Sequence, residues 1–250
     1  MSEPRTGGAA LVTGGSGGIG RATVAALASA GHPVAVGWAR DDEGAGKAVA
    51  EAEAAGVAAT SVHIDVTDPD SVGDAFALVE ERLGGVGILV NNAGVTRDGL
   101  ALRMGDDQWS DVLRVNLDGA FHTVRRALPG MVRARWGRIV NMGSVSGLVG
   151  TPGQANYAAA KAGLVGLTRS VAREVATRGI TCNVVAPGPV ATPMLDGLSA
   201  ERRQELTAAV PMGRMAEPGE VAAVVAFLCG PAASYVTGAV VPVDGGLSMH

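Results

Sequence analysis

Two side chains that could form a proton donor and its activator stand four residues apart, at Tyr157 and Lys161. On a helix this spacing places both side chains on one face. A phenol, with an ordinary pKa near about 10, exchanges protons poorly at neutral pH, and a neighbouring ammonium lowers that pKa by stabilising the phenolate. The pair therefore predicts acid–base catalysis at Tyr157.

Lys161 is one of only two lysines, beside eighteen arginines. Where arginine supplies almost every positive charge, a lysine indicates a special need, because a compact ammonium can hydrogen-bond ribose hydroxyls and pass a proton. For an isolated pair, a surface tyrosine with an incidental lysine is the alternative. Ser144, thirteen residues before Tyr157 at the expected end of a strand, favours the catalytic interpretation.

A glycine-rich loop lies near the start of the chain, where residues 13–20 read TGGSGGIG. Gly15, Gly17 and Gly20 satisfy the pattern GxGxxG, between an apolar strand and a helix. Glycines let the backbone approach a pyrophosphate, whose charge then lies on the N–H groups of the helix N-terminus. In this context the pattern predicts a dinucleotide cofactor.

The same residues match the hydrolase motif GxSxG, with Ser16 as the nucleophile. That motif needs an acid and a histidine at later strand ends, and an oxyanion loop before the serine. Only a short tail precedes this loop, and no later histidine except His250 lies in an expected strand-end loop. We therefore reject a serine hydrolase.

Short apolar runs alternate with helical patterns along the chain. Strands are expected at residues 9–13, 34–37, 60–64, 88–90, 138–142, 181–185 and 240–243, and helices at 19–30, 47–55, 69–83, 107–131, 156–178 and 217–228. Such alternation produces right-handed crossovers. It predicts an α/β, Rossmann-like fold, with one doubly wound parallel sheet of about seven strands and helices on both faces.

No repeat or linker divides the chain, so we expect one domain over residues 1–250. Residues 1–8 lack the apolar stretch of a signal peptide and are expected to form a flexible tail. Around residues 187–215, prolines and glycines interrupt the alternation. A long excursion is often functional, so we expect a substrate lid, with an ordinary irregular connection as the alternative.

The composition argues against several functions. A net charge of −4, without a basic block and with 3% aromatic residues, argues against a nucleic-acid surface. No apolar run is long enough for a membrane span, so a cytoplasmic protein is expected. Cys182 and Cys229 stand far apart without nearby histidines, which predicts two buried reduced thiols and no metal site.

Taken in order, the motifs resemble those of the short-chain dehydrogenase/reductase family over essentially the whole chain. They are TGxxxGIG at 13–20, NNAG at 91–94, Ser144, YxxxK at 157–161 and PG at 187–188. The resemblance implies that Ser144 hydrogen-bonds the substrate carbonyl while Tyr157 protonates its oxygen. Asn116 matches the family asparagine that holds a water linking Lys161 to solvent, and a helix-bending polar residue is the alternative.

The resemblance also implies a set of cofactor-binding residues. Asp65 matches the residue whose side chain meets the adenine amino group, with a simple loop cap as the alternative, and Thr192 is placed to bind the carboxamide. With Tyr157 and Lys161, the set comprises Gly14, Ser16, Gly17, Gly18, Ile19, Gly20, Arg40, Asp65, Val66, Asn92, Ala93, Gly94, Pro187, Gly188, Val190 and Thr192.

The residues after the second expected strand favour NADP(H). NAD-preferring relatives place an acid where Trp38 stands, to hold the ribose hydroxyls. No acid is present there, and Arg40 is placed to meet the 2′-phosphate instead. The chain departs from many NADP-dependent relatives at Gly17, where they carry an arginine, and at Ala39, where their second-strand arginine often falls.

Three segments are similar to those of 3-oxoacyl-(acyl-carrier-protein) reductases: GVTRDGL at 94–100, QANYAAAKAG at 154–163 and RGIT at 178–181. The resemblance implies reduction of a 3-oxoacyl thioester on acyl carrier protein, in fatty-acid biosynthesis. Polyketide ketoreductases and acetoacetyl-CoA reductases stay open as alternatives. A non-catalytic NADP-sensing regulator would typically lack the tyrosine or the lysine, and both are present.

The resemblance further implies a homotetramer that pairs the helices expected at 107–131 and 156–178. For an acidic carrier protein we expect a local basic patch, because the chain itself is net negative. The candidates, expected to border the active-site cleft, are Arg133, Arg135, Arg138, Arg173 and Arg178, with Arg135 and Arg178 foremost. Solvated charges, or ion pairs with a neighbouring subunit, are the alternative.

Overall fold

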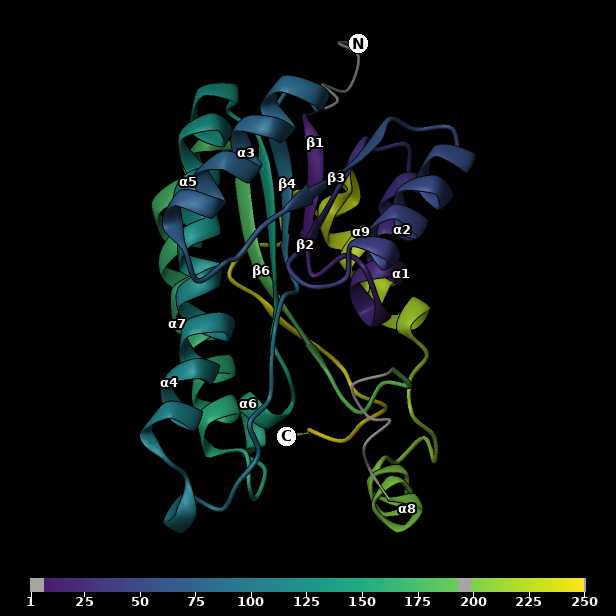
Figure 1. Cartoon of the computed structure of the whole chain (residues 1–250), viewed down its shortest axis with the longest axis vertical. Helices are drawn as coiled ribbons and strands as arrows, with labels where there is room; N and C mark the ends of the chain where they lie inside the picture. The colour runs from purple at the N-terminus through teal and green to yellow at the C-terminus, as the bar shows by residue number, and fades with distance from the viewer. Residues whose placement is uncertain (1–6, 193–198, 250) are drawn as a thin grey trace.

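The computed structural model describes residues 7–192 and 199–249 of the chain. The strands form one parallel sheet in the order β3-β2-β1-β4-β5-β6-β7 (Figure 1). Their bounds are β1 (Ala9–Thr13), β2 (Val34–Trp38), β3 (Ala59–His63), β4 (Val86–Asn91), β5 (Gly137–Met142), β6 (Ile180–Pro187) and β7 (Val240–Val243). The doubly wound fold is thus confirmed, and each strand lies within two residues of its expected bounds.

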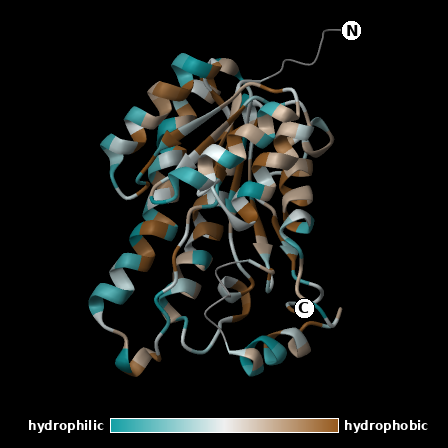
Figure 2. Ribbon diagram, turned by 45° about the vertical axis from the view of Figure 1, so that its right-hand side comes forward, coloured by the Kyte–Doolittle hydropathy of each residue, from teal (hydrophilic) through white to brown (hydrophobic). Residues whose placement is uncertain are grey.

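Helices cover both faces of this sheet (Figure 1). One face carries α1 (Gly18–Ser29), α2 (Asp42–Ala54) and α9 (Pro218–Cys229), and the other carries α3 (Pro69–Leu83), α5 (Gly119–Ala134) and α7 (Ala155–Val175). Each face of the sheet has its own hydrophobic core, and successive residues of a strand point to opposite faces. Val12 thus belongs to the core on the first face and Leu11 to the core on the second. Figure 2 shows these apolar strands enclosed between helices whose outward turns are hydrophilic.

Two helices differ from the sequence expectation. α2 begins at Asp42, five residues before its expected start, because the side chain of Asp41 caps it by accepting from the N–H of Gly44 at 2.9 Å. The helix expected at 107–131 is interrupted, since α4 (Asp106–Leu113) reaches α5 through a π-helical turn at Arg114–Asp118. Hydrophobic periodicity does not register a single wide turn inside a helix.

The region at 187–215 is less irregular than expected. It contains α8 (Ala200–Ala209), whose N-terminus is capped by the Ser199 hydroxyl, which accepts from the N–H of Arg202 at 3.2 Å. The helix was missed because it has no apolar face, and none of its residues is buried. Residues 193–198 of this region, like residues 1–6 of the expected tail and His250, lie outside the described residues.

The carboxyl ends of the strands share one edge of the sheet, and the strand order reverses there between β1 and β4. Ligands of open α/β sheets bind at such a switch point. The loop that leaves β1 is the glycine-rich loop, and the loop that leaves β4 contains Asn92 and Gly94. The fold therefore brings the two predicted cofactor segments side by side.

A chain of buried polar side chains joins the sheet to the helices just below this edge. Thr123 of α5 donates to Asn91 of β4 at 2.6 Å, and Asn91 donates to Asn141 of β5 at 2.8 Å. Asn141 in turn donates to Thr168 of α7 at 2.8 Å. A buried polar group without a partner costs about 1–3 kcal/mol. The chain therefore fixes α5 and α7 relative to β4 and β5.

Candidate active site

Ser144, Tyr157 and Lys161 converge at the carboxyl edge of the sheet. Ser144 follows β5 by two residues, and its side chain hydrogen-bonds that of Tyr157. Lys161 lies one turn after Tyr157 on α7, with its ammonium 5.4 Å from the centre of the tyrosine ring. The structure thus brings together the three residues to which the sequence assigned the chemistry.

The lysine is almost fully enclosed, at 4% exposure. Its Nζ donates to the carbonyl oxygen of Met142, the last residue of β5, at 2.7 Å. Burial disfavours the charged form and lowers the pKa of Lys161 to about 8. Lys161 therefore releases a proton much closer to neutral pH than an exposed lysine does.

The expectation that Lys161 lowers the pKa of Tyr157 is wrong for this structure. Burial raises the pKa of Tyr157 to about 12, against an opposing hydrogen bond from Ser144 and with a further rise from the negative charge of Asp98. Lys161 does not offset the burial, because with a pKa of about 8 it is already neutral at the pH where a phenol with a pKa of about 12 ionises. Tyr157 therefore holds its proton throughout the neutral range.

Asn116 occupies the middle of the π-helical turn and is 2% exposed. Its side-chain nitrogen donates to the carbonyl oxygens of Val95 and Val112, each at 2.9 Å. Its Oδ1 has no partner among the described residues. A Cβ built on Gly94 would lie 2.7 Å from this oxygen and 3.7 Å from Lys161 Nζ. The wide turn thus presents a free acceptor in the neighbourhood of Lys161.

Thr13 and Asn92 fasten the glycine loop to the end of β4. The Thr13 hydroxyl accepts from the N–H groups of Asn92 and Ala93, each at 3.0 Å. The Asn92 side chain donates to the carbonyls of Thr13 and Gly14, at 3.1 and 2.9 Å. We call these contacts the Thr13–Asn92 latch. The sequence prediction omitted Thr13, although its position directly before the first glycine was a signal.

The loop itself has the shape that a pyrophosphate needs. Gly14 and Gly18 have φ values of 62° and 52°, in the left-handed region that favours glycine. Gly17 gives α1 no side-chain cap, and the first turn of α1 carries no acid. The N–H groups at the N-terminus of α1 are therefore paired with no side chain of Gly17 and with no acid of the first turn, so they can bind an anion. A Cβ built on Gly18 would lie 3.4 Å from Thr192, so the expected carboxamide residue also reaches this loop.

The loop after β6 lies beside Ser144. The Pro187 carbonyl accepts from the N–H of Val145 at 3.0 Å, and Gly188 packs so closely on Asp244 that a Cβ would lie 2.9 Å from its Cα. Val190, two residues further on, is buried. The predicted residues of this loop are therefore held between the segment that carries Ser144 and the C-terminal turn.

Asp65, the residue predicted to meet the adenine amino group, also caps its own loop. Its carboxylate accepts from the hydroxyl and the N–H of Thr67, at 2.8 and 2.9 Å, which lowers the pKa of Asp65. Val66 is buried, and its carbonyl lies 3.0 Å from His122 Nδ1. Ser16 and Ile19 are half-buried in the glycine loop, and Arg40 is exposed.

Comparison with known proteins places this geometry in a family. A family model of the short-chain dehydrogenase type, described as enoyl-(acyl carrier protein) reductase, matches residues 14–248. Curated relatives named 3-oxoacyl-(acyl-carrier-protein) reductase FabG match over 240 residues, or 96% of this chain. The proteins of Pseudomonas aeruginosa, Vibrio cholerae and Staphylococcus aureus are 47%, 46% and 45% identical over 97%, 97% and 98% of their own lengths. The chain belongs to the short-chain dehydrogenase/reductase family.

Members of this family are oxidoreductases that use a nicotinamide cofactor, and the residues at the switch point fit such a cofactor.

Over residues 7–192 and 199–249, no group of three or more histidine, cysteine, aspartate or glutamate side chains could hold a metal ion. The same residues include no helix long and apolar enough to cross a membrane. Cys182 and Cys229 are both buried free thiols.

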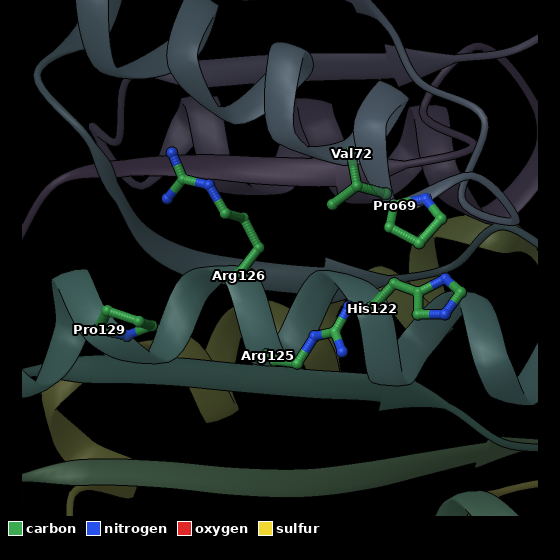
Figure 3. Close-up of a pocket in the computed structure, with 6 residues that line it drawn as sticks. All are labelled: Pro69, Val72, His122, Arg125, Arg126 and Pro129. Atoms are coloured by element: carbon green, nitrogen blue, oxygen red, sulfur yellow. The ribbon is translucent and has the colours of Figure 1, made fainter.

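A separate groove of about 220 Å³ lies between α3 and α5 of this dehydrogenase/reductase fold. Figure 3 shows Pro69 and Val72 on α3, facing the α5 residues that complete its lining, His122, Arg125, Arg126 and Pro129. Arg126 is already paired with Glu80 at 2.9 Å. None of the lining residues belongs to the predicted site, so the groove is distinct from the catalytic edge.

The expected basic patch does not border the cleft within one chain. Arg135 and Arg178 each stand two residues before a strand, β5 and β6, so they lie at the amino edge of the sheet. Ser144 lies at the opposite edge, and a strand of this length spans about 20 Å. Arg138 is only 5% exposed and stacks 4.8 Å from the Trp136 ring centre, so it cannot take part in docking.

Gly20 tests the Thr13–Asn92 latch. A Cβ at Gly20 would overlap the Gly14 carbonyl oxygen and lie 2.6 Å from Asn92 Nδ2. We expect Gly20→Ala to destabilise the protein by about 1–3 kcal/mol in urea unfolding, as overpacking does, and to weaken NADPH binding. Gly17→Ala is the matched control, since nothing lies within 4 Å of a Cβ there. Equal stability of the two variants would contradict the latch.

Proposed function

We propose that this protein reduces the ketone of a 3-oxoacyl thioester, carried on acyl carrier protein, to the 3-hydroxyacyl product with NADPH. The observation that carries the proposal is the hydrogen-bonded pair of Ser144 and a Tyr157 phenol that burial keeps protonated. Two hydroxyl groups that lie side by side can both donate a hydrogen bond to the oxygen of one carbonyl group. The names of the relatives, which match 96% of the chain, support the same substrate class.

Ser144, Tyr157 and Lys161 have separate roles in the proposed reaction. NADPH, when bound, supplies the hydride that the carbonyl carbon accepts. Ser144 Oγ accepts from the N–H of Ser146 at 3.1 Å, so its own proton remains for a hydrogen bond to the carbonyl oxygen. Tyr157 gives its proton to that oxygen as the C=O electron pair moves onto it. Lys161, with Asn116 beside it, returns a proton from solvent towards Tyr157.

We propose a ketone rather than the carbon–carbon double bond that the family description names. The curated relatives that match 96% of the chain are named 3-oxoacyl reductases, and these names favour the ketone. Polyketide ketoreductases and acetoacetyl-CoA reductases would use the same arrangement of Ser144 and Tyr157, and the substrate assays below separate them.

For the cofactor we propose NADP(H). Trp38 packs edge-on against His63, with ring centres 5.0 Å apart, and offers no carboxylate to the ribose hydroxyls. Asp41, the next acid along the chain, is engaged as the cap of α2 through Gly44. Arg40 is exposed and forms no ion pair among the described residues. These observations leave a free guanidinium for the 2′-phosphate of NADP.

We propose that residues 187–215 act as a substrate lid. The Ala216 N–H donates to Pro189 and the Ala191 N–H donates to Ala216, each at 2.9 Å, which closes the base of the excursion. α8 adds no buried residue to either core. A segment whose two ends are hydrogen-bonded together and whose helix is not buried suits a lid that moves against the site.

For the whole protein we propose the cytoplasm, a reducing compartment that suits its two free thiols.

We also propose a homotetramer, because its assembly restores the missing basic patch. Trp109 of α4 and Phe121 of α5 are 41% and 44% exposed, which suits helix pairing between subunits. α7 has 21 residues and spans about 32 Å. If it pairs antiparallel with its copy, Arg178 of one subunit comes beside the end of α7 that carries Tyr157 in the other. The carrier would then dock across two subunits.

Catalysis is tested at Tyr157 and Lys161. We expect Tyr157→Phe to lower kcat by about 10²–10⁴-fold, because it removes the proton donor, while the Kd for NADPH stays within twofold. Lys161→Arg should also be severely impaired, since a guanidinium does not replace a compact ammonium. The measurement is NADPH consumption with a small 3-ketoester, an acetoacetyl-CoA and a carrier-bound 3-oxoacyl substrate. Normal turnover by Tyr157→Phe would refute the mechanism.

The cofactor proposal is tested at Arg40. Because a hydrogen bond to a charged group contributes about 1.5–3 kcal/mol, Arg40→Ala should raise the KM for NADPH by roughly 10–100-fold and leave the KM for NADH unchanged. Arg133→Ala, an exposed arginine at the amino edge, is the control. A parallel rise for both cofactors would count against a 2′-phosphate contact.

Docking is tested by the double charge reversal of Arg135 and Arg178 to glutamate. We expect a higher KM for the carrier-bound substrate, no change for a small 3-ketoester, and a loss that disappears at high salt, because rim charges mainly govern encounter. Light scattering of the same variant reports the assembly. Equal impairment with both substrates, in an intact tetramer, would rule out carrier docking at these arginines.

A further inference from the structure

A ladder of side-chain hydrogen bonds ties together two loops that flank the catalytic residues. The first loop follows β4 and includes Asp98 and Gly99. The second joins β5 to α7 and includes α6 (Ser146–Val149) and Gln154. Gly99 and Gln154 form a parallel bridge, and the Gly99 N–H donates to the Gly153 carbonyl at 2.8 Å. The backbones of the two loops are therefore already in contact at Gln154.

Gln154 is the centre of the ladder. Its side-chain nitrogen donates to the Asp98 carboxylate at 3.0 Å, and its side-chain oxygen accepts from the Ser146 hydroxyl at 3.1 Å. Ser146 also accepts from the hydroxyl of Thr151 at 2.9 Å. The ladder reaches the catalytic serine through the Ser146 N–H, which donates to Ser144 Oγ at 3.1 Å.

The direction of each hydrogen bond follows from its neighbours. Asp98 can only accept, so Gln154 must present its nitrogen to Asp98 and its oxygen to Ser146. The Ser146 proton is then committed to Gln154, and its backbone N–H is committed to Ser144. The Ser144 proton remains for Tyr157 or for a substrate oxygen. Glutamine satisfies this order because one end of its amide donates and the other accepts.

We propose that Gln154 is a positioning residue, which orients Ser144 through Ser146 and ties it to Asp98 on the neighbouring loop. The proposal rests on the proposed function, because it gives Ser144 and Tyr157 their catalytic meaning. Gln154 itself touches no reacting atom. Its effect passes through α6, the short turn that follows Ser144, and through the loop that begins three residues before Gln154 at Thr151.

The charged groups around the ladder are few. Asp98 is exposed, forms no ion pair among the described residues, and acts on Tyr157 by its negative charge. Arg97 and Arg103, on the same loop, are exposed and form no ion pair with Asp98 within the described residues. Lys161 is committed to the Met142 carbonyl. A new charge at position 154 would therefore meet the Asp98 carboxylate first.

The test is a double-mutant cycle of Gln154→Glu and Asp98→Asn. Gln154→Glu sets two carboxylates about 3 Å apart, which like charges oppose strongly. We expect its kcat, divided by the wild-type kcat at the same pH, to fall about tenfold as pH rises and the introduced carboxyl group ionises. The ratio should return towards one at low pH, where the protonated carboxyl can donate to Asp98. The NADPH Kd should stay unchanged.

Asp98→Asn should rescue the Gln154→Glu variant, because the new amide nitrogen can donate to the new carboxylate. We expect the double variant to recover kcat to within about threefold of wild type at every pH. Gln108→Glu is the matched control: its oxygen would still accept from the Gly105 N–H, as Gln108 does at 3.0 Å. It should show no pH-dependent loss.

Two results would overturn the inference. One is a Gln154→Glu variant with wild-type kcat at all pH values, and the other is an absence of rescue by Asp98→Asn. A merely structural role predicts a lower thermal midpoint in Gln154→Glu, with a loss of kcat that does not vary with pH. Failure of the proposed function is distinct, because wild-type protein would then reduce no 3-oxoacyl substrate.

Discussion

The bond between Lys161 and the Met142 carbonyl is the contact on which the catalytic arrangement depends. An ammonium at 4% exposure is costly to bury unless a partner accepts a hydrogen bond from it, and the carbonyl at the end of β5 is that partner, at 2.7 Å. The bond fixes the start of α7 against β5. Tyr157 lies one turn before the lysine and Ser144 two residues beyond the methionine, so one contact positions both hydroxyl groups.

The cofactor side of the site depends on a second kind of constraint, the strand order. Reversal of the strand order between β1 and β4 opens a crevice between the loops that leave these two strands. The latch from Thr13 to Asn92 joins the bases, and the left-handed glycines let the tip turn away. Below both, Asn91 of β4 and Asn141 of β5 link their strands to α5 and α7. Cofactor and substrate sites therefore share one rigid support.

Much of this could be predicted from the sequence, because apolar runs and glycine spacing report directly on strands and on the first turn. Features that depend on a side chain meeting a distant one could not. Nothing in the local pattern marks the wide turn at Asn116 or the link from Gln154 to Asp98. Arg135 and Arg178 were misplaced for a related reason: they neighbour the catalytic segments in sequence, but a strand or helix length separates them in space.

Burial shifts the pKa values of the two titrating groups of the site in opposite directions, and each shift favours the uncharged form. It raises the pKa of Tyr157 to about 12 and lowers that of Lys161 to about 8, because each loses hydration in its charged form. A protonated phenol at neutral pH is the form that can give a proton to a carbonyl oxygen as that oxygen becomes negative. Burial and the charge of Asp98 disfavour the phenolate that this transfer leaves. The proposed return of a proton through Lys161, whose pKa lies nearer neutral, would relieve that cost, so the step depends on both residues.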